Sequence, residues 1–125
     1  MPRVLIVDDE DSMRALVARA IAMDGHDIAT AQDGAEALEI LSGEQGAFDL
    51  LLTDIQMPVM DGIALALAVA RDFPDLTILL MTGFADQRER ASGLNAIAHD
   101  VITKPFSVAD IRTAVADALA TRKAG

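Results

Sequence analysis

Several side chains that carry oxygen or nitrogen stand directly after short apolar runs of the sequence. Asp8 and Asp9 follow the first run and Asp54 follows a later one, while Thr82 and Lys104 end two others. A hard cation such as Mg2+ prefers oxygen ligands, so Asp9 and Asp54 could bind it directly while Asp8 holds a water ligand. A carboxylate can also act as the nucleophile of phosphoryl transfer and form an aspartyl phosphate. The set is therefore suited to magnesium-assisted phosphoryl transfer.

Two further side chains of this set could bind the phosphoryl group. The barrier to phosphoryl transfer depends mostly on positioning and charge neutralisation, which the Lys104 ammonium and the Thr82 hydroxyl could supply. Each residue alone has a plainer interpretation: Asp8 and Asp9 as a helix cap, Asp54 as a turn residue, Lys104 as a surface charge. Their joint position at the ends of strands is what favours a site.

The apolar runs alternate with amphipathic segments, which is typical of repeated strand–helix units. Strands are expected at Val4–Val7, Ile28–Ala31, Phe48–Thr53, Leu76–Thr82 and Val101–Thr103. Helices are expected from a cap at Asp11 or Ser12 to Gly25, from Asp33 with Glu36 through Leu41, over Gly62–Asp72, over Gln87–Leu94, and from Ser107 with Asp110 through Ala120. This pattern predicts an α/β fold, a doubly wound five-stranded parallel sheet with helices on both faces. Ligands of such sheets bind beyond the carboxyl ends of the strands, where the residues above gather.

Composition narrows the classes of function. The 125 residues suit one domain at 1–121 with a short tail at 122–125 and no output domain. A net charge of −10 argues against nucleic acid and anionic membranes as partners. The absence of cysteine excludes disulfides, thiol catalysis and zinc–thiolate sites. The longest apolar run, Ile63–Ala70, is far shorter than the roughly 20 residues of a membrane span. We expect the cytoplasm, with a cell pole as a candidate location within it.

The chain resembles bacterial response-regulator receiver domains over nearly its whole length. The matching segments are Val4–Glu10, Asp54–Gly62, Met81–Gly83 and Lys104–Phe106. The resemblance implies a CheY-like or flavodoxin-like sheet in the order 2-1-3-4-5. It also implies that Asp54 accepts a phosphoryl group from the phosphohistidine of a histidine kinase or histidine phosphotransferase. The chain would catalyse only its own phosphorylation and dephosphorylation, so it is not expected to be an enzyme in the usual sense.

The resemblance assigns roles to further residues. Asp8 and Asp9 would form the acidic pair around Mg2+, with the backbone carbonyl of Gln56 as another ligand. Thr82 and Lys104 would bind the phosphoryl group. The peptide bond between Lys104 and Pro105 would be cis, and Gly62 would allow a tight turn into the helix that follows.

One position departs from the family pattern. Val101 stands three residues before the lysine, where family members commonly carry Tyr or Phe, and the chain contains no Tyr. The inward swing of an aromatic side chain that accompanies phosphorylation in the family therefore cannot work here in the usual way. Phe84 is the nearest aromatic residue to Thr82 in the sequence. It is either a packing or surface residue, or a partner contact or lid over the phosphoryl group.

A narrower resemblance is to the CpdR type of stand-alone regulator, carried by Asp49–Asp54, Gly62–Ala68 and Gln87–Leu94. It implies an unphosphorylated form that primes the ClpXP protease, with ClpX as effector, and a cell-cycle phosphorelay that switches this off. Arg88 and Arg90 would then belong to a contact surface, and otherwise to a solvated helix face.

Alternative functions remain within and outside the switch class. A phosphate sink or a phosphorelay intermediate would use the same pocket. A phosphatase with an Asp nucleophile would need an acid two residues later, where the chain has Gln56, and a cap domain. A flavodoxin-like electron carrier would need stacking aromatics, whereas the aromatic content is 3%. A DNA-binding regulator would need a second domain and a positive surface.

Overall fold

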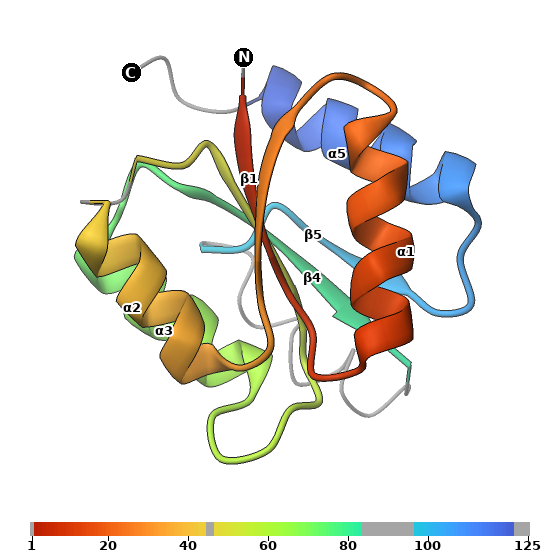
Figure 1. Cartoon of the computed structure of the whole chain (residues 1–125). Helices are drawn as coiled ribbons and strands as arrows, with labels where there is room; N and C mark the ends of the chain where they lie inside the picture. Colours follow the sequence, from red (N-terminus) through yellow and green to blue (C-terminus); the bar gives the residue numbers. More distant parts are fainter. Residues whose placement is uncertain (1, 45–46, 84–96, 122–125) are drawn as a thin grey trace.

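Short apolar runs form the sheet, and their carboxyl ends lie along one edge of it. The computed structural model describes residues 2–44, 47–83 and 97–121. Within this part of the chain the strands are β1 (Arg3–Val7), β2 (Asp27–Ala31), β3 (Leu50–Asp54), β4 (Thr77–Thr82) and β5 (Asp100–Thr103). Neighbouring strands are parallel, in the order β2-β1-β3-β4-β5 (Figure 1). The expected five-stranded sheet and its order are confirmed.

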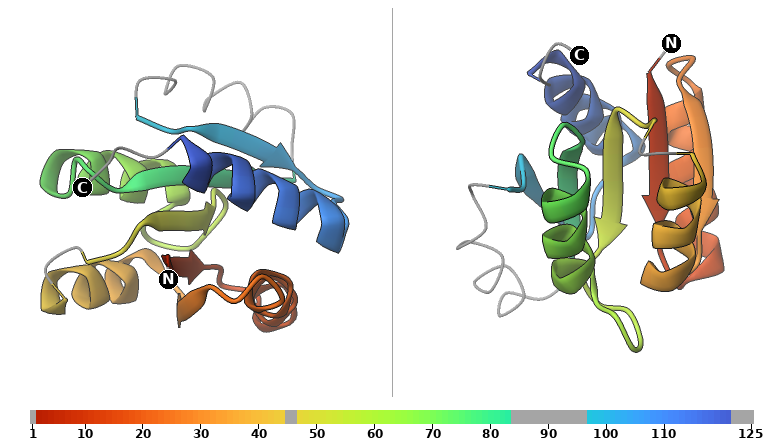
Figure 2. Two further views of the ribbon diagram at one scale, coloured as in Figure 1. Left: turned by 90° about the horizontal axis from the view of Figure 1, so that it is seen from above. Right: turned by 90° about the vertical axis from the view of Figure 1, so that its left-hand side faces the viewer.

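Helices cover both faces of the sheet. α2 (Gly34–Gly43) and α3 (Gly62–Asp72) pack on one face, and α1 (Asp11–Ala22) and α5 (Val108–Ala120) pack on the other. The two pairs lie on opposite sides of the strands in Figure 1 and in the left-hand view of Figure 2. No helix in the described ranges has the length and hydropathy that crossing a bilayer requires.

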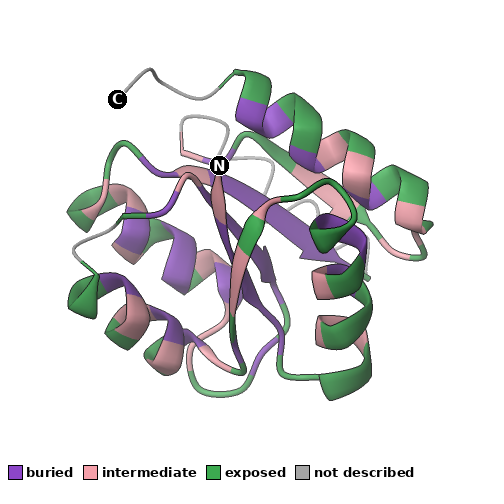
Figure 3. Cartoon of the chain, turned by 45° about the horizontal axis from the view of Figure 1, so that its top comes forward, coloured by how far each residue is buried: buried purple, intermediate pink, exposed green. Residues whose placement is uncertain are grey.

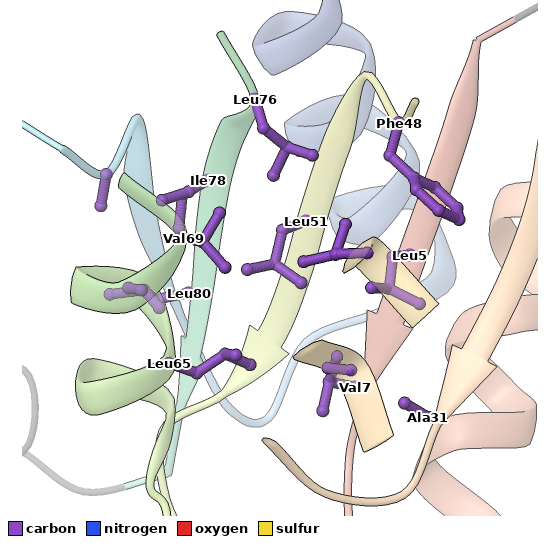
Figure 4. Packing of buried hydrophobic residues seen from close by; sticks show 14 of the residues in the cluster. Leu5, Val7, Ala31, Phe48, Leu51, Leu65, Val69, Leu76, Ile78 and Leu80 are labelled. Carbon is purple, nitrogen blue, oxygen red and sulfur yellow. The ribbon is translucent and has the colours of Figure 1, made fainter. Parts of the chain in front are cut away.

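The sheet separates two hydrophobic cores, because successive side chains of a strand point to opposite faces. Leu5, Val7 and Leu51 are buried beneath α2 and α3 (Figure 4). The alternate residues of β1, Val4 and Ile6, are buried beneath α1 and α5. The three central strands, β1, β3 and β4, are therefore buried on both faces, whereas the helices expose their outer sides (Figure 3). A strand held from both faces ends at a fixed place, which positions the residue that follows it.

The helix starts confirm two predicted caps and correct a third. The Asp33 side chain accepts a hydrogen bond from the Glu36 N–H, and Ser107 and Asp110 form a reciprocal capping box. Neither Asp11 nor Ser12 caps α1. Both lie inside its first turn, and the N-cap position belongs to the preceding residue, Glu10. The physical reason is that the Asp8 carboxylate accepts the Glu10 N–H, which turns the chain into the helix one residue earlier.

Other differences concern the ends of elements and one helix face. β3 begins at Leu50 instead of Phe48, where its pairing with β1 starts. The Arg3 guanidinium lies over the Phe48 ring, 4.3 Å from its centroid. On α1, Val17, Ala20 and Ile21 are buried, whereas the apolar Leu16 is 37% exposed. The expected helix at Gln87–Leu94 lies outside the described residues.

Gly62 lets α3 start directly against the end of β3. Its N–H donates to the Ile55 carbonyl at 2.8 Å, and a Cβ at this position would lie 2.1 Å from the carbonyl oxygen of Asp54. Its φ is not in the left-handed region, so close approach of backbone is what requires glycine here. The Asp61 side chain caps the same helix by accepting the Ala64 N–H. The backbone of Asp54 is therefore held by the start of α3.

We predict that Gly62→Ala lowers the free energy of unfolding by about 3 kcal/mol, because the clash is with rigid backbone. The matched control is Gly43→Ala at the exposed end of α2, where an added Cβ meets no atom of the described residues within 4 Å. That change should be neutral or stabilise by up to about 1 kcal/mol. Urea unfolding of the two variants beside wild type measures both. Equal stability of the two variants would contradict the close approach at Gly62.

Candidate functional site

Three carboxylates meet where β1 and β3 end. Asp8 and Asp9 follow β1, Asp54 is the last residue of β3, and their ligand oxygens all lie within 4.8 Å of one another. Asp8 and Asp54 are buried and Asp9 is exposed. A cluster of this kind suits a cation that takes protein oxygens on one side and water on the other.

Asp8 gives the clearest indication that this cluster suits a cation. Its backbone N–H donates to the Ala31 carbonyl at 3.2 Å, and its Oδ1 accepts the Glu10 N–H at 2.9 Å. Its Oδ2 is buried and has no hydrogen-bond partner among the described residues. Leaving a buried carboxylate oxygen unpaired is unfavourable, and a divalent cation would satisfy it. The donor set is all oxygen, so the three acids fit Mg2+.

The electrostatics of the cluster agree with this interpretation. Burial raises the pKa of the Asp8 carboxyl from 3.8 to about 6, against the hydrogen bond from Glu10, and the charges of Asp54 and Asp9 raise it further. Burial also raises the pKa of Asp54, although the Lys104 ammonium lowers it. Without a cation the negative charges of the site therefore oppose one another and the fold.

Lys104, the residue after β5, brings a positive charge to the same edge. Its Nζ lies 3.2 Å from Asp54 Oδ1, and its backbone N–H donates to the Thr82 carbonyl at 2.7 Å. The bond between Lys104 and Pro105 is cis, as expected. Thr82 is fully buried at the end of β4. The ends of β4 and β5 thus join those of β1 and β3 in one site.

A polar pocket opens over these residues. It is lined by Asp9, Glu10, Asp54, Gln56, Gly83 and Lys104. The structure therefore places the predicted residue Gln56 beside the acids. Glu10 was not among the predicted site residues, although it continues the acidic run of Asp8 and Asp9 and could have been found from it.

The loop between β3 and α3 contains a strained turn that the sequence did not predict. The Met60 N–H donates to the Pro58 carbonyl at 2.7 Å, and the intervening Val59 has a φ of 67° and is fully exposed. A β-branched residue in this conformation costs on the order of 1 kcal/mol. The loop is thus held in a tight shape immediately after Asp54.

The predicted switch residues are placed only in part. Val101 lies in the edge strand β5, half-buried, and packs against the core beneath α2 and α3. Phe84, Arg88 and Arg90 lie outside the described residues.

We predict that Asp8→Asn stabilises the metal-free protein at neutral pH. The folded pKa of Asp8, about 6, exceeds the unfolded value of 3.8, so its ionisation destabilises the fold as pH rises through this window. The penalty is on the order of 2–3 kcal/mol at neutral pH and vanishes at about pH 4. Thermal melts of the variant and wild type at both pH values measure it.

The same melts test the cation. Millimolar Mg2+ should raise the melting temperature of wild type and have much less effect on Asp8→Asn. Asp75→Asn, a change of the same kind at an exposed residue, is the control and should respond like wild type. The three acids do not form one site if Mg2+ leaves the melting temperature of wild type unchanged and wild type melts no lower than Asp8→Asn.

Comparison with known proteins agrees with this geometry. Residues 4–116 match the family model of the response regulator receiver domain. PrrA, a transcriptional regulatory protein of Mycobacterium tuberculosis, is 36% identical over 110 residues, 88% of this chain and 46% of PrrA. The response regulator MprA of Mycobacterium ulcerans is 34% identical over 109 residues, 87% of this chain and 46% of MprA. The chain thus spans less than half the length of these curated relatives.

Solved structures give the same result over the full fold. The receiver domain of NtrX from Brucella abortus superposes with a TM-score of 0.85 at 30% identity, covering 94% of this chain and 98% of that one. The response regulator TrrA of Thermotoga maritima, solved in complex with Mg2+-BeF, gives a TM-score of 0.82 at 31% identity with the same coverage. With the family model, the sheet order and the acidic site in agreement, this chain belongs to the response regulator receiver domains.

Proposed function

We propose that Asp54 accepts a phosphoryl group from the phosphohistidine of a histidine kinase or histidine phosphotransferase. The observation that carries the proposal is the position of its carboxylate. It is buried at the end of β3, within 4.8 Å of the ligand oxygens of Asp8 and Asp9 and 3.2 Å from Lys104 Nζ. Acid, metal ligands and cation are the parts that transfer to a carboxylate needs.

The transfer itself is a displacement at phosphorus. An Asp54 carboxylate oxygen forms the new O–P bond while the P–N bond to the donor imidazole breaks. The imidazole nitrogen keeps the electron pair of that bond and takes a proton from solvent. Lys104, which now pairs with Asp54 Oδ1, can transfer its hydrogen bond to an oxygen of the arriving phosphoryl group.

The metal would be held by Asp9, Asp54 and the Gln56 carbonyl, with Asp8 binding through water. When bound, Mg2+ neutralises the charge of the phosphoryl oxygens. TrrA, solved with Mg2+-BeF, is a relative whose structure contains this cation beside a fluoride complex. The support from this chain's own residues is Asp8 Oδ2, which is buried without a hydrogen-bond partner among the described residues.

Thr82 would link phosphorylation to a change of surface. Its hydroxyl would donate to the phosphoryl group, and its carbonyl already accepts the Lys104 N–H, so β4 and β5 would respond together. A ligand shifts a two-state element only by its differential interaction with the two states, and this contact supplies one. We propose that the response does not use an aromatic swing at Val101, since the position is aliphatic.

We predict that a small phosphodonor such as phosphoramidate, with Mg2+, adds one phosphoryl group to the protein and none to Asp54→Asn. Intact mass spectrometry after timed incubation measures the adduct. Asp75→Asn is the matched control and should be labelled like wild type. Lys104→Ala should be labelled more slowly, because the charge of the transferring group is less well neutralised. A full adduct on Asp54→Asn would move the acceptor elsewhere.

We further propose that the output is a contact with a protein effector, and that the effector is ClpX, bound by the unphosphorylated form. The support is the CpdR resemblance of Asp49–Asp54, Gly62–Ala68 and Gln87–Leu94. The curated relatives reported above are regulators that this chain matches over less than half their length. A phosphate sink or a phosphorelay intermediate is the alternative within the same class.

We predict that immobilised wild type retains purified ClpX, and that beryllofluoride with Mg2+ lowers retention several-fold. Asp54→Ala should retain ClpX with and without beryllofluoride, because it lacks the acceptor. Phe84→Ala and Arg88→Ala should lower retention if these side chains belong to the contact. No retention in any state, with normal labelling of Asp54, would reject ClpX and favour a sink or relay intermediate.

A further inference from the structure

Arg14 makes two contacts on the loop between β1 and α1. Its Nη1 donates to the backbone carbonyl of Asp8 at 2.8 Å, and its Nη2 lies 2.5 Å from Asp11 Oδ1. Its side chain is only 20% exposed although it belongs to a surface helix. Both contacts are with the loop and the first turn of α1, so the guanidinium joins the helix to the segment that carries the acids.

The carbonyl that Arg14 binds belongs to the peptide plane between Asp8 and Asp9. Because a peptide is planar, fixing this oxygen also fixes the direction in which the chain continues to Asp9. The other polar groups of Asp8 are held by the Ala31 carbonyl and the Glu10 N–H. With its backbone restrained on both sides, the remaining oxygen, Oδ2, stays buried beside Asp54.

We infer that Arg14 is a positioning residue for the cation site, which holds the peptide between the two metal-binding acids. The inference rests on the proposed magnesium site. The guanidinium bonds the backbone carbonyl of Asp8 and the side chain of Asp11. These two bonds restrain the loop and leave the carboxylates of the cluster to the cation. A guanidinium suits this role because its planar fork bonds two acceptors in a fixed relation.

Charge and position have opposite consequences, which makes the inference testable. A positive charge near a cation site repels Mg2+, so removing Arg14 for electrostatic reasons alone would tighten Mg2+ binding. Removing a residue that positions the ligands would weaken binding. Loss of such an outer partner commonly weakens metal affinity by about tenfold or more.

The experiment measures the Mg2+ dissociation constant of Arg14→Ala by calorimetry and by amide NMR titration, since the chain has no Trp or Tyr as an internal fluorophore. We expect an increase of about tenfold. Arg19→Ala is the matched control: the residue lies on the same helix, is exposed, and its loss changes the net charge equally. It should leave the constant unchanged or slightly lower.

Arg14→Lys keeps the charge but loses the fork, and it carries the test if Arg14→Ala does not fold. It should bind Mg2+ more weakly than wild type. Binding by the Arg14 variants that equals or exceeds that of wild type would overturn the inference and leave the proposed function intact. So would a lower melting temperature with an unchanged dissociation constant, which marks a structural role only. Wild type that binds no Mg2+ would overturn both.

Discussion

Mutual repulsion of three carboxylates at the end of one sheet is the constraint on which this protein depends. Asp8, Asp9 and Asp54 place their ligand oxygens within 4.8 Å of one another, and two of the three side chains are buried. Like charges this close in a partly dry site destabilise the fold. The arrangement persists because the hydrophobic layers around it stabilise the fold by more than the acids cost. Because the carboxylates repel one another, binding of a cation or approach of a cationic side chain stabilises the fold.

Lys104 is the cationic side chain that partly neutralises this cluster. It reaches Asp54 from the end of β5, fifty positions later in the sequence, and offsets part of the burial penalty on that carboxyl. Asp8 has no such partner among the described residues for its Oδ2. The site is therefore asymmetric: one acid is paired with a side chain, and the other is left for a ligand from solution. This asymmetry suits the roles proposed above, in which Asp54 accepts a phosphoryl group and Asp8 contributes to the metal site.

Several features restrain the backbone around the acids. Gly62 presses the start of α3 against Asp54, Val59 is kept at a φ of 67°, and Arg14 holds the peptide after Asp8. Each contact restrains the chain within a few residues of a carboxylate. Catalysis of phosphoryl transfer relies on positioning. Backbone restraint is therefore expected next to carboxylates that would otherwise move apart to reduce their repulsion. The buried strands supply the rigid base for it.

The strands, the fold class and the position of most site residues could be predicted from the sequence, because these depend on local pattern. Apolar runs buried on both faces predict parallel strands, and the residues after them must meet at the carboxyl edge. The caps at Asp33 and Ser107 were likewise readable, since capping joins residues three apart. The family resemblance added the cis bond before Pro105, which the structure confirms.

The hydrogen bonds of the loops around the acids depend instead on tertiary contacts. The start of α1 at Asp11 follows from the Asp8 side chain, and the left-handed Val59 from closure of the loop into α3. The burial of Asp8 Oδ2 without a hydrogen-bond partner among the described residues follows from how the segments around it pack. These features depend on which groups from distant segments satisfy a given backbone or side-chain atom. No spacing of residue types along the chain specifies that, because it is set by three-dimensional competition for hydrogen bonds once the sheet has formed.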